Sequence, residues 1–243
     1  LCRNRIGFFE ALFACAKLGA ILVPLNWRAP VPELAPLIEM TRPRAFLYGT
    51  EDQAAVGALP ACGLALGFDD DGPDGYEARL EHARPDPGRA QWPAQDTWYL
   101  LFTSGTTGLP KAVIQTYAMA MVNYVNLGQA IDLVSTDVTL NFLPLFHTSG
   151  INLHTLPTLL AGGQVLVLPG FEPETMMDLL DAGRLTTFFG VPAIYQGLSL
   201  HPRFASVDLT RVRHWGCGGA PLPDTLVHVF ADRGAMVCNG FGM

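Results

Sequence analysis

Short, continuously apolar runs alternate with helix-like segments along most of this chain. Examples are AFLYG (45–49), VTLNFL (138–143), QVLVL (164–168) and TTFFGV (186–191), each too short for a typical helix. Strands that are apolar on both faces are typical of parallel sheets covered by helices. The pattern therefore predicts an α/β fold of layered, parallel-rich sheets with helices on both faces.

The remaining elements follow from the same patterns. Helices are predicted up to about Leu18 and over residues 31–41, 118–131, 150–161, 173–182, 193–198 and 223–233. Further strands are predicted over residues 20–25, 98–102, 112–115, 212–218 and 235–241. Residues 50–95 carry clusters of Asp, Gly and Pro, including FDDDGPDG, and are predicted to be mostly surface loop without a metal site.

The amino-acid composition limits the kinds of molecule that this chain is expected to bind. The chain has 243 residues, 49% of them hydrophobic, and 15 basic against 22 acidic residues give a formal charge of -7. This balance excludes a general nucleic-acid binder, so an anionic substrate must be met locally by a few groups. Five scattered cysteines without CxxC spacing favour reduced thiols in a cytoplasmic protein over disulfides or zinc. No apolar run approaches the roughly 20 residues that span a bilayer.

The segment TSGTTGLPKA (103–112) places glycines and hydroxyls around one lysine, between two strands. A turn between the strands is the simplest interpretation. A Walker A loop is excluded by spacing, because Pro110 precedes Lys111 and Ala112 follows it, whereas that motif needs Gly before and Ser or Thr after the lysine. Proline favours an extended chain here, so Lys111 is predicted to begin a strand. The N–H groups and hydroxyls of such a loop can surround a polyphosphate.

LLFTSGTTGLPKAV resembles the signature loop of the acyl-adenylate-forming, AMP-binding enzymes, and other segments agree in the family's order. LPLFHTSGIN resembles the segment that lines the acyl pocket, and GCGGAPLPDTL and NGFGM resemble the adenine-binding segments. The resemblance covers nearly the whole chain, and it implies that residues 1–243 form part of the family's large N-terminal domain. It is closest to acyl-CoA synthetases, and it implies ATP, Mg²⁺ and CoA as cofactors or co-substrates.

The resemblance assigns roles to individual residues. The phosphates of ATP would be held by Thr103, Ser104, Gly105, Thr106, Thr107, Gly108 and Lys111. The adenine pocket would be formed by Gly218, Gly219, Ala220, Pro221, Asn239, Gly240, Phe241 and Gly242. The acyl group would meet His147, Thr148 and Ser149. Lys111 would grip the leaving pyrophosphate, and we expect His147 to position or gate rather than act as a general base.

Several features depart from the family pattern. Ala112 stands where relatives usually have Gly, and Tyr117 where they commonly have His. The chain stops at Met243, where the family continues with Thr-Glu, so the magnesium-binding Glu lies beyond it and no metal ligand is assigned. The C-terminal domain with its catalytic lysine is also absent, so this chain alone is expected to be inactive.

Three functions remain open at this stage. The leading one is ATP-dependent activation of a fatty or aromatic carboxylic acid to acyl-AMP, followed by transfer to the CoA thiol. The alternatives are transfer to a carrier-protein thiol, or a non-catalytic nucleotide-binding module. GCGGAPLP also fits a plain strand-to-helix turn, and His154 has no second ligand nearby in sequence that would complete a zinc site.

Overall fold

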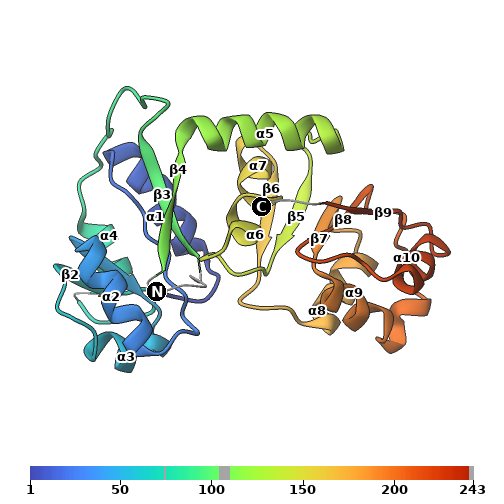
Figure 1. Cartoon of the computed structure of the whole chain (residues 1–243), viewed down its shortest axis with the longest axis horizontal. Coiled ribbons are helices and arrows are strands. Elements are labelled where there is room, and N and C mark those ends of the chain that lie inside the picture. The colour runs from blue at the N-terminus through green and yellow to red at the C-terminus, as the bar shows by residue number, and fades with distance from the viewer. Residues whose placement is uncertain (74, 104–109, 241–243) are drawn as a thin grey trace. The chain divides into compact units, whose positions relative to one another are not determined.

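The chain divides into two units, each built on its own short strands (Figure 1). The computed structural model describes residues 1–73, 75–103 and 110–240. The first unit holds Leu1–Met119 with Leu145–His147, and the second holds Ala120–Pro144 with the chain from Thr148 onward.

The first unit combines a parallel strand pair with an antiparallel hairpin. Strands β1 (Ala45–Tyr48) and β2 (Leu64–Gly67) pair in parallel, and β3 (Thr97–Thr103) pairs antiparallel with β4 (Lys111–Thr116). The helices of this unit are α1 (Ile6–Leu18), α2 (Val31–Thr41), α3 (Gln53–Gly57) and α4 (Tyr76–His82), with a 3-10 turn at Thr50–Asp52.

Helix α1 is fixed to the hairpin by its apolar face and by its end. Phe8, Phe9 and Leu12 are buried, and the indole N–H of Trp98 on β3 donates to the Leu12 carbonyl at 2.9 Å. The helix ends at Gly19, whose φ of 71° is easily adopted only without a side chain. The sequence thus sets both the packing and the length of α1.

The second unit is a parallel α/β arrangement. Strands β5 (Val138–Asn141) and β6 (Gln164–Val167) pair in parallel, as do β7 (Thr187–Gly190), β8 (His214–Cys217) and β9 (Val237–Asn239). The Thr186 N–H donates to the Val138 carbonyl at 2.9 Å and so joins β7 to β5. The helices are α5 (Tyr117–Ile131), which begins at the end of the first unit, α6 (Thr148–Ile151), α7 (Thr155–Leu160), α8 (Pro173–Asp181), α9 (Pro192–Ser199) and α10 (Asp224–Ala231).

The two faces of this second sheet differ in chemistry. One face carries Leu140, Phe188 and Trp215, which pack with side chains of α8, α9 and α10 in the apolar core. Because successive strand residues face opposite sides, Thr139, Asn141, Thr187 and His214 lie on the other face, toward α7. The Asn141 amide donates to the Thr155 hydroxyl of α7 at 2.7 Å. Helices therefore cover both faces, and the predicted fold class is confirmed.

A buried ion pair closes the amino-terminal edge of the same sheet. Asp137 is 2% exposed, and its carboxylate accepts hydrogen bonds from Nε (3.1 Å) and Nη2 of Arg213. It also accepts hydrogen bonds from the Thr186 hydroxyl (2.7 Å) and the Val134 N–H (2.8 Å). Arg213 also donates to the Ile131 carbonyl. Burial raises the pKa of Asp137, but these hydrogen bonds outweigh it and the net pKa lies below the usual value. The end of α5 and the starts of β5, β7 and β8 are joined here.

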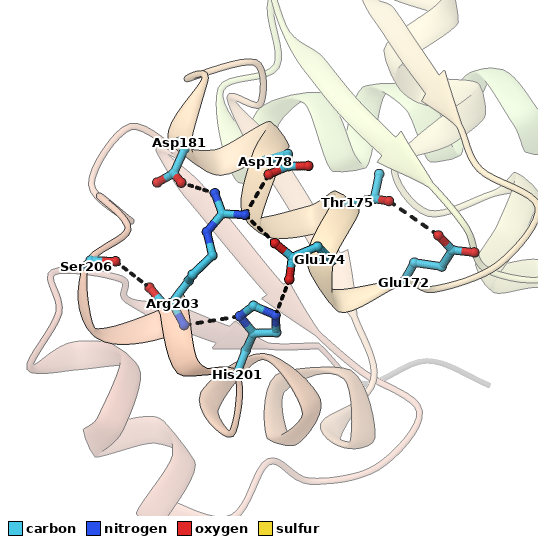
Figure 2. A network of polar contacts seen from close by, with 8 residues as sticks. All are labelled: Glu172, Glu174, Thr175, Asp178, Asp181, His201, Arg203 and Ser206. Atoms are coloured by element: carbon cyan, nitrogen blue, oxygen red, sulfur yellow. Dashed lines mark hydrogen bonds and ion pairs between the residues drawn. The ribbon is translucent and has the colours of Figure 1, made fainter.

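An exposed network on α8 has the opposite character (Figure 2). Arg203 lies among Glu174, Asp178 and Asp181, which share one face of the helix. Its backbone N–H donates to Nδ1 of His201, so that ring carries its proton on Nε2 and donates to Glu174 at 2.9 Å. The network positions the 3-10 turn Pro202–Ala205 on α8. It adds little to the free energy of unfolding, because ion pairs between exposed groups are screened by water.

Two sequence predictions were wrong in detail, and a third missed several short elements. Residues 20–25 form no strand, because only Leu22 bridges to Tyr99 beside Pro24. The 50–95 stretch is mostly loop, as predicted, but it also contains α3, β2 and α4 as well as a 3-10 turn. The helix predicted over 150–161 is two helices, α6 and α7. Pro157 has no N–H to donate to the Leu153 carbonyl, so it is accommodated only in the first turn of a new helix.

Candidate functional site

The predicted adenine-binding segments meet at the carboxyl edge of the second sheet. Strands β7, β8 and β9 end there at Gly190, Cys217 and Asn239. The Gly218 N–H donates to the Gly190 carbonyl at 3.3 Å, and the Gly240 N–H donates to the Cys217 carbonyl at 2.7 Å. Residues 218–221 and 239–240 are thus brought together, whereas Phe241 and Gly242 lie outside the described residues.

The glycines at this edge allow close packing at one position and an unusual backbone conformation at the next. A Cβ on Gly218 would lie 2.9 Å from Cζ of Phe189 and 3.3 Å from the Gly240 carbonyl oxygen, and Gly219 has a φ of +80°. Gly219, Ala220 and Pro221 are exposed. A flat ligand can therefore lie on exposed backbone at the carboxyl ends of parallel strands, where folds of this class bind ligands.

The ends of the predicted phosphate loop lie side by side in the first unit. Thr103 and Lys111 are paired across β3 and β4, both are exposed, and the Thr103 hydroxyl donates to the Lys111 carbonyl at 3.4 Å. The prediction that Lys111 begins a strand is confirmed. The loop residues Ser104, Gly105, Thr106, Thr107 and Gly108 lie outside the described residues.

The predicted acyl-pocket segment runs from an exposed His147 into α6, which begins at Thr148. The Thr148 hydroxyl accepts from the Asn152 amide at 3.0 Å, and the Asn152 carbonyl accepts from the Asn123 amide of α5. The Asn141 amide, at the end of β5, donates to the Gly150 carbonyl at 2.7 Å. The segment after His147 is thus held from two sides.

Sequence reasoning missed Asn141 as a supporting residue. Its signal was a lone amide inside the apolar run VTLNFL. An amide that is 2% exposed is costly to bury unless it is hydrogen-bonded. Here two of its hydrogen bonds go to the α6–α7 region, so Asn141 fixes that region to the sheet.

His154 is a second residue whose setting the sequence did not predict. It is 5% exposed, and its Nδ1 has no hydrogen-bond partner among the described residues. Its ring centroid lies 5.4 Å from that of His214 and 5.5 Å from that of Phe189. Burial, aided by His214 and Arg213, lowers the pKa of His154 from 6.5 to about 3. Burial likewise lowers the pKa of His214. Both rings are therefore neutral at neutral pH.

Acid is expected to destabilise the second unit through His154. Since its folded-state pKa is lowered, the unfolded chain binds the proton more tightly, and stability is lost as the pH falls from 6.5 toward about 3. His154→Phe should therefore lose less melting temperature than wild type between pH 7 and pH 4. His228→Phe, at an exposed position on α10, serves as the control. Parallel pH curves for wild type and His154→Phe would contradict this assignment.

Comparison with known proteins decides the family. The family model described as AMP-binding enzyme matches residues 1–243. The chain belongs to the AMP-binding enzyme family. Among curated relatives, the AMP-binding chain is 37% identical over 240 residues to a feruloyl-CoA synthase of Amycolatopsis sp., covering 99% of this chain and 47% of that protein. It is 33% identical over 245 residues to an indoleacetate–CoA ligase of Aromatoleum aromaticum, covering 98% of this chain and 48% of that protein.

Solved structures agree with the AMP-binding assignment. The inhibitor-bound N-terminal domain of FACL13 from Mycobacterium tuberculosis superposes with a TM-score of 0.90 at 25% identity, covering all of this chain and 61% of that one. ATP-bound MatB from Rhodopseudomonas palustris gives a TM-score of 0.84 at 25% identity, covering 100% of this chain and 49% of that one. The AMP-binding chain spans about half the length of the curated relatives it matches.

Two further observations on the AMP-binding chain concern membrane-spanning helices and clusters of metal-binding side chains. Within the part of the chain that the structure describes, no helix is long and apolar enough to cross a membrane. The same residues contain no cluster of three or more His, Cys, Asp or Glu side chains that could hold a metal ion.

Proposed function

We propose that this chain provides the nucleotide-binding part of a longer enzyme that activates an aromatic carboxylic acid with ATP and transfers the acyl group to CoA. The observation that carries the proposal is the meeting of two glycine segments, 218–221 and 239–240, at one carboxyl edge of a parallel sheet. Relatives named for feruloyl and indoleacetate substrates favour an aromatic acid over a fatty one.

In this proposal the chain contributes alignment and charge. The exposed backbone at Gly219 and Ala220 receives the adenine ring, and Phe241 stacks on it. Lys111 and the hydroxyls and N–H groups of residues 103–108 hold the phosphates, so that the carboxylate of the acid attacks the α-phosphate and pyrophosphate leaves. Glycines 105 and 108 allow the backbone to approach the phosphate oxygens closely.

The acyl acceptor and the compartment belong to the same proposal. CoA is the expected acceptor, and Mg²⁺ would be bound by residues outside this chain. All five cysteines are unpaired, which supports a reducing, cytoplasmic setting. Transfer to a carrier protein is the second candidate, since a fatty acid–[acyl-carrier-protein] ligase of Streptomyces coeruleorubidus is 28% identical over 229 residues.

Product analysis tests the acceptor and the acid together. The full-length protein is incubated with ATP, CoA or an acyl carrier protein, and matched aromatic and fatty acids. We expect AMP and an aromatic acyl-CoA. A thioester formed only on the carrier protein would support the second candidate, and release of ADP in place of AMP would contradict an adenylate route altogether.

The pocket beyond His147 is expected to set the size of the acid. Leucine at Thr148 or Ser149 adds volume where the acyl group is proposed to lie, so kcat/KM should shift toward smaller acids by roughly 10-fold. Thr225→Leu, at an exposed position on α10, is the matched control. An unchanged acid profile in both pocket variants would place the acyl group elsewhere.

A further inference from the structure

A tight turn of the first unit, over residues 26–29, presents Trp27 and Arg28 at its tip. The Ala29 N–H donates to the Asn26 carbonyl at 3.0 Å, and the Arg28 N–H donates to Oδ1 of Asn26 at 3.0 Å. An Asn side chain that bonds the backbone two residues further on stabilises such a turn locally. The backbone that carries both side chains is therefore fixed before any partner binds.

The indole ring of Trp27 holds two arginines close together. Cζ of Arg28 lies 4.8 Å from the ring centroid, and Cζ of Arg3, in the segment before α1, lies 5.1 Å from it. Both distances are those of cation–π contacts. Trp27 is half-buried, and both arginines are exposed. Neither guanidinium forms an ion pair with a carboxylate in the part of the chain that the structure describes. Arg3, Trp27 and Arg28 together are called the Arg–Trp tip.

The chemistry of the Arg–Trp tip fits a partner with an acidic surface. The whole chain has a formal charge of -7, so an acidic protein would in general be repelled, and two unpaired arginines on one ring are a local exception. Trp and Arg are also the residues that most often dominate the binding energy of protein–protein interfaces. Charge complementarity of this kind orients a partner as it approaches.

The turn lies next to the ends of the predicted phosphate loop. A pocket of about 120 Å³ has walls from this turn, from both ends of that loop and from the residue before His147. These wall residues include Asn26, Ala29, Thr103, Pro110 and Phe146. All of them belong to the first unit. A protein bound at the Arg–Trp tip can therefore extend a flexible arm past the pocket toward His147.

We propose that the Arg–Trp tip docks an acidic acyl carrier protein, so that the full-length enzyme loads a carrier-protein thiol as well as CoA. The inference rests on the proposed function, because it needs the acyl-adenylate. The carrier's thiol sulfur attacks the carbonyl carbon of the acyl-adenylate and forms a thioester bond. The bond from that carbon to the phosphate oxygen breaks, AMP leaves with the electron pair, and the thiol proton passes to solvent.

The test measures transfer of one aromatic acid by the full-length enzyme to a phosphopantetheine-loaded, acidic acyl carrier protein and, separately, to CoA. Arg3→Glu and Arg28→Glu should each lower kcat/KM for the carrier protein about 10-fold, because each reverses a charge at the docking surface. The kcat/KM for CoA and the acid-dependent ATP–pyrophosphate exchange should stay at wild-type values, which a folding defect would not allow. Arg184→Glu, the same charge change at an exposed position of the second unit, is the matched control.

Two further measurements detect the contact itself. Transfer to the carrier protein should slow as the salt concentration rises, because salt screens the attraction between exposed charges, and Arg28→Glu should respond less than wild type. A set of carrier proteins, each with one surface Glu changed to Lys, should include at least one that restores part of the transfer by Arg28→Glu.

The outcomes separate the inference from the proposed function. Wild-type transfer to the carrier protein in both arginine variants would overturn the inference and leave the proposed function standing. The same holds if wild type forms acyl-CoA but never loads the carrier protein. A loss of kcat/KM for CoA alone would assign the Arg–Trp tip to the phosphates of CoA and would also overturn the docking. If no acid is activated at all, the proposed function fails and the inference fails with it.

Discussion

Lys111→Ala is expected to lower ATP–pyrophosphate exchange by the full-length enzyme by on the order of 100-fold, the cost of removing one group that stabilises developing charge. Lys111 is exposed at the start of β4, where it pairs with Thr103 at the end of β3. The melting temperature should therefore stay within about one degree of wild type.

The chain offers a matched control, because Lys17 and Lys111 are its only lysines. Lys17 is exposed in the last turn of α1, and Lys17→Ala should keep full exchange activity. ATP should also protect Lys111, and not Lys17, from an amine-reactive label. Normal exchange in Lys111→Ala, or equal labelling of both lysines with ATP present, would remove Lys111 from the phosphate site.

Asp137→Ala is expected to lower the free energy of unfolding by about 3 kcal/mol, because it leaves the Arg213 guanidinium without its buried partner. The estimate lies at the low end for such pairs, since the Arg213 side chain is 36% exposed. Chemical denaturation of the isolated chain measures the effect. Asp178→Ala is the matched control, because Asp178 also pairs with an arginine but on the exposed face of α8, and its loss should matter far less.

The pH dependence of the same residue gives an independent check. Because its folded-state pKa is lowered, the stabilisation by Asp137 is present above its usual pKa near 4 and is lost as the pH falls below it. The stability gap between wild type and Asp137→Asn should therefore narrow in acid. A gap that stays constant to low pH would mean that the ion pair contributes little.

The elements best predicted from sequence are those whose pattern is local. Helix α2 was predicted over residues 31–41 and has those bounds, because its apolar spacing and the prolines at its start are both features of the local sequence. Within the stretch 50–95, which is mostly loop as predicted, strand β2 was missed for the converse reason. Strand β2 is only four residues long and is held by pairing with β1, a contact that no local pattern contains.

The same difference between local patterns and long-range contacts decides which parts of the candidate site could be predicted. The glycine segments at residues 218 and 240 could be assigned from their resemblance to a family, and parallel pairing of β8 and β9 brings them together. The histidine pair could not be assigned this way. His154 and His214 are 60 positions apart, and only the packing of α7 on the sheet places both rings over Gly216. Polar residues inside apolar runs, such as Asn141 and Thr187, were the one sequence signal of that polar face.

The central claim is that this chain belongs to an enzyme that forms an acyl-adenylate. Its most direct test is incorporation of labelled pyrophosphate into ATP by the full-length protein, with and without an aromatic acid and in the absence of CoA. The account predicts exchange that requires the acid and does not require CoA. Exchange that is independent of any acid, or no exchange across a panel of aromatic and fatty acids, would contradict it.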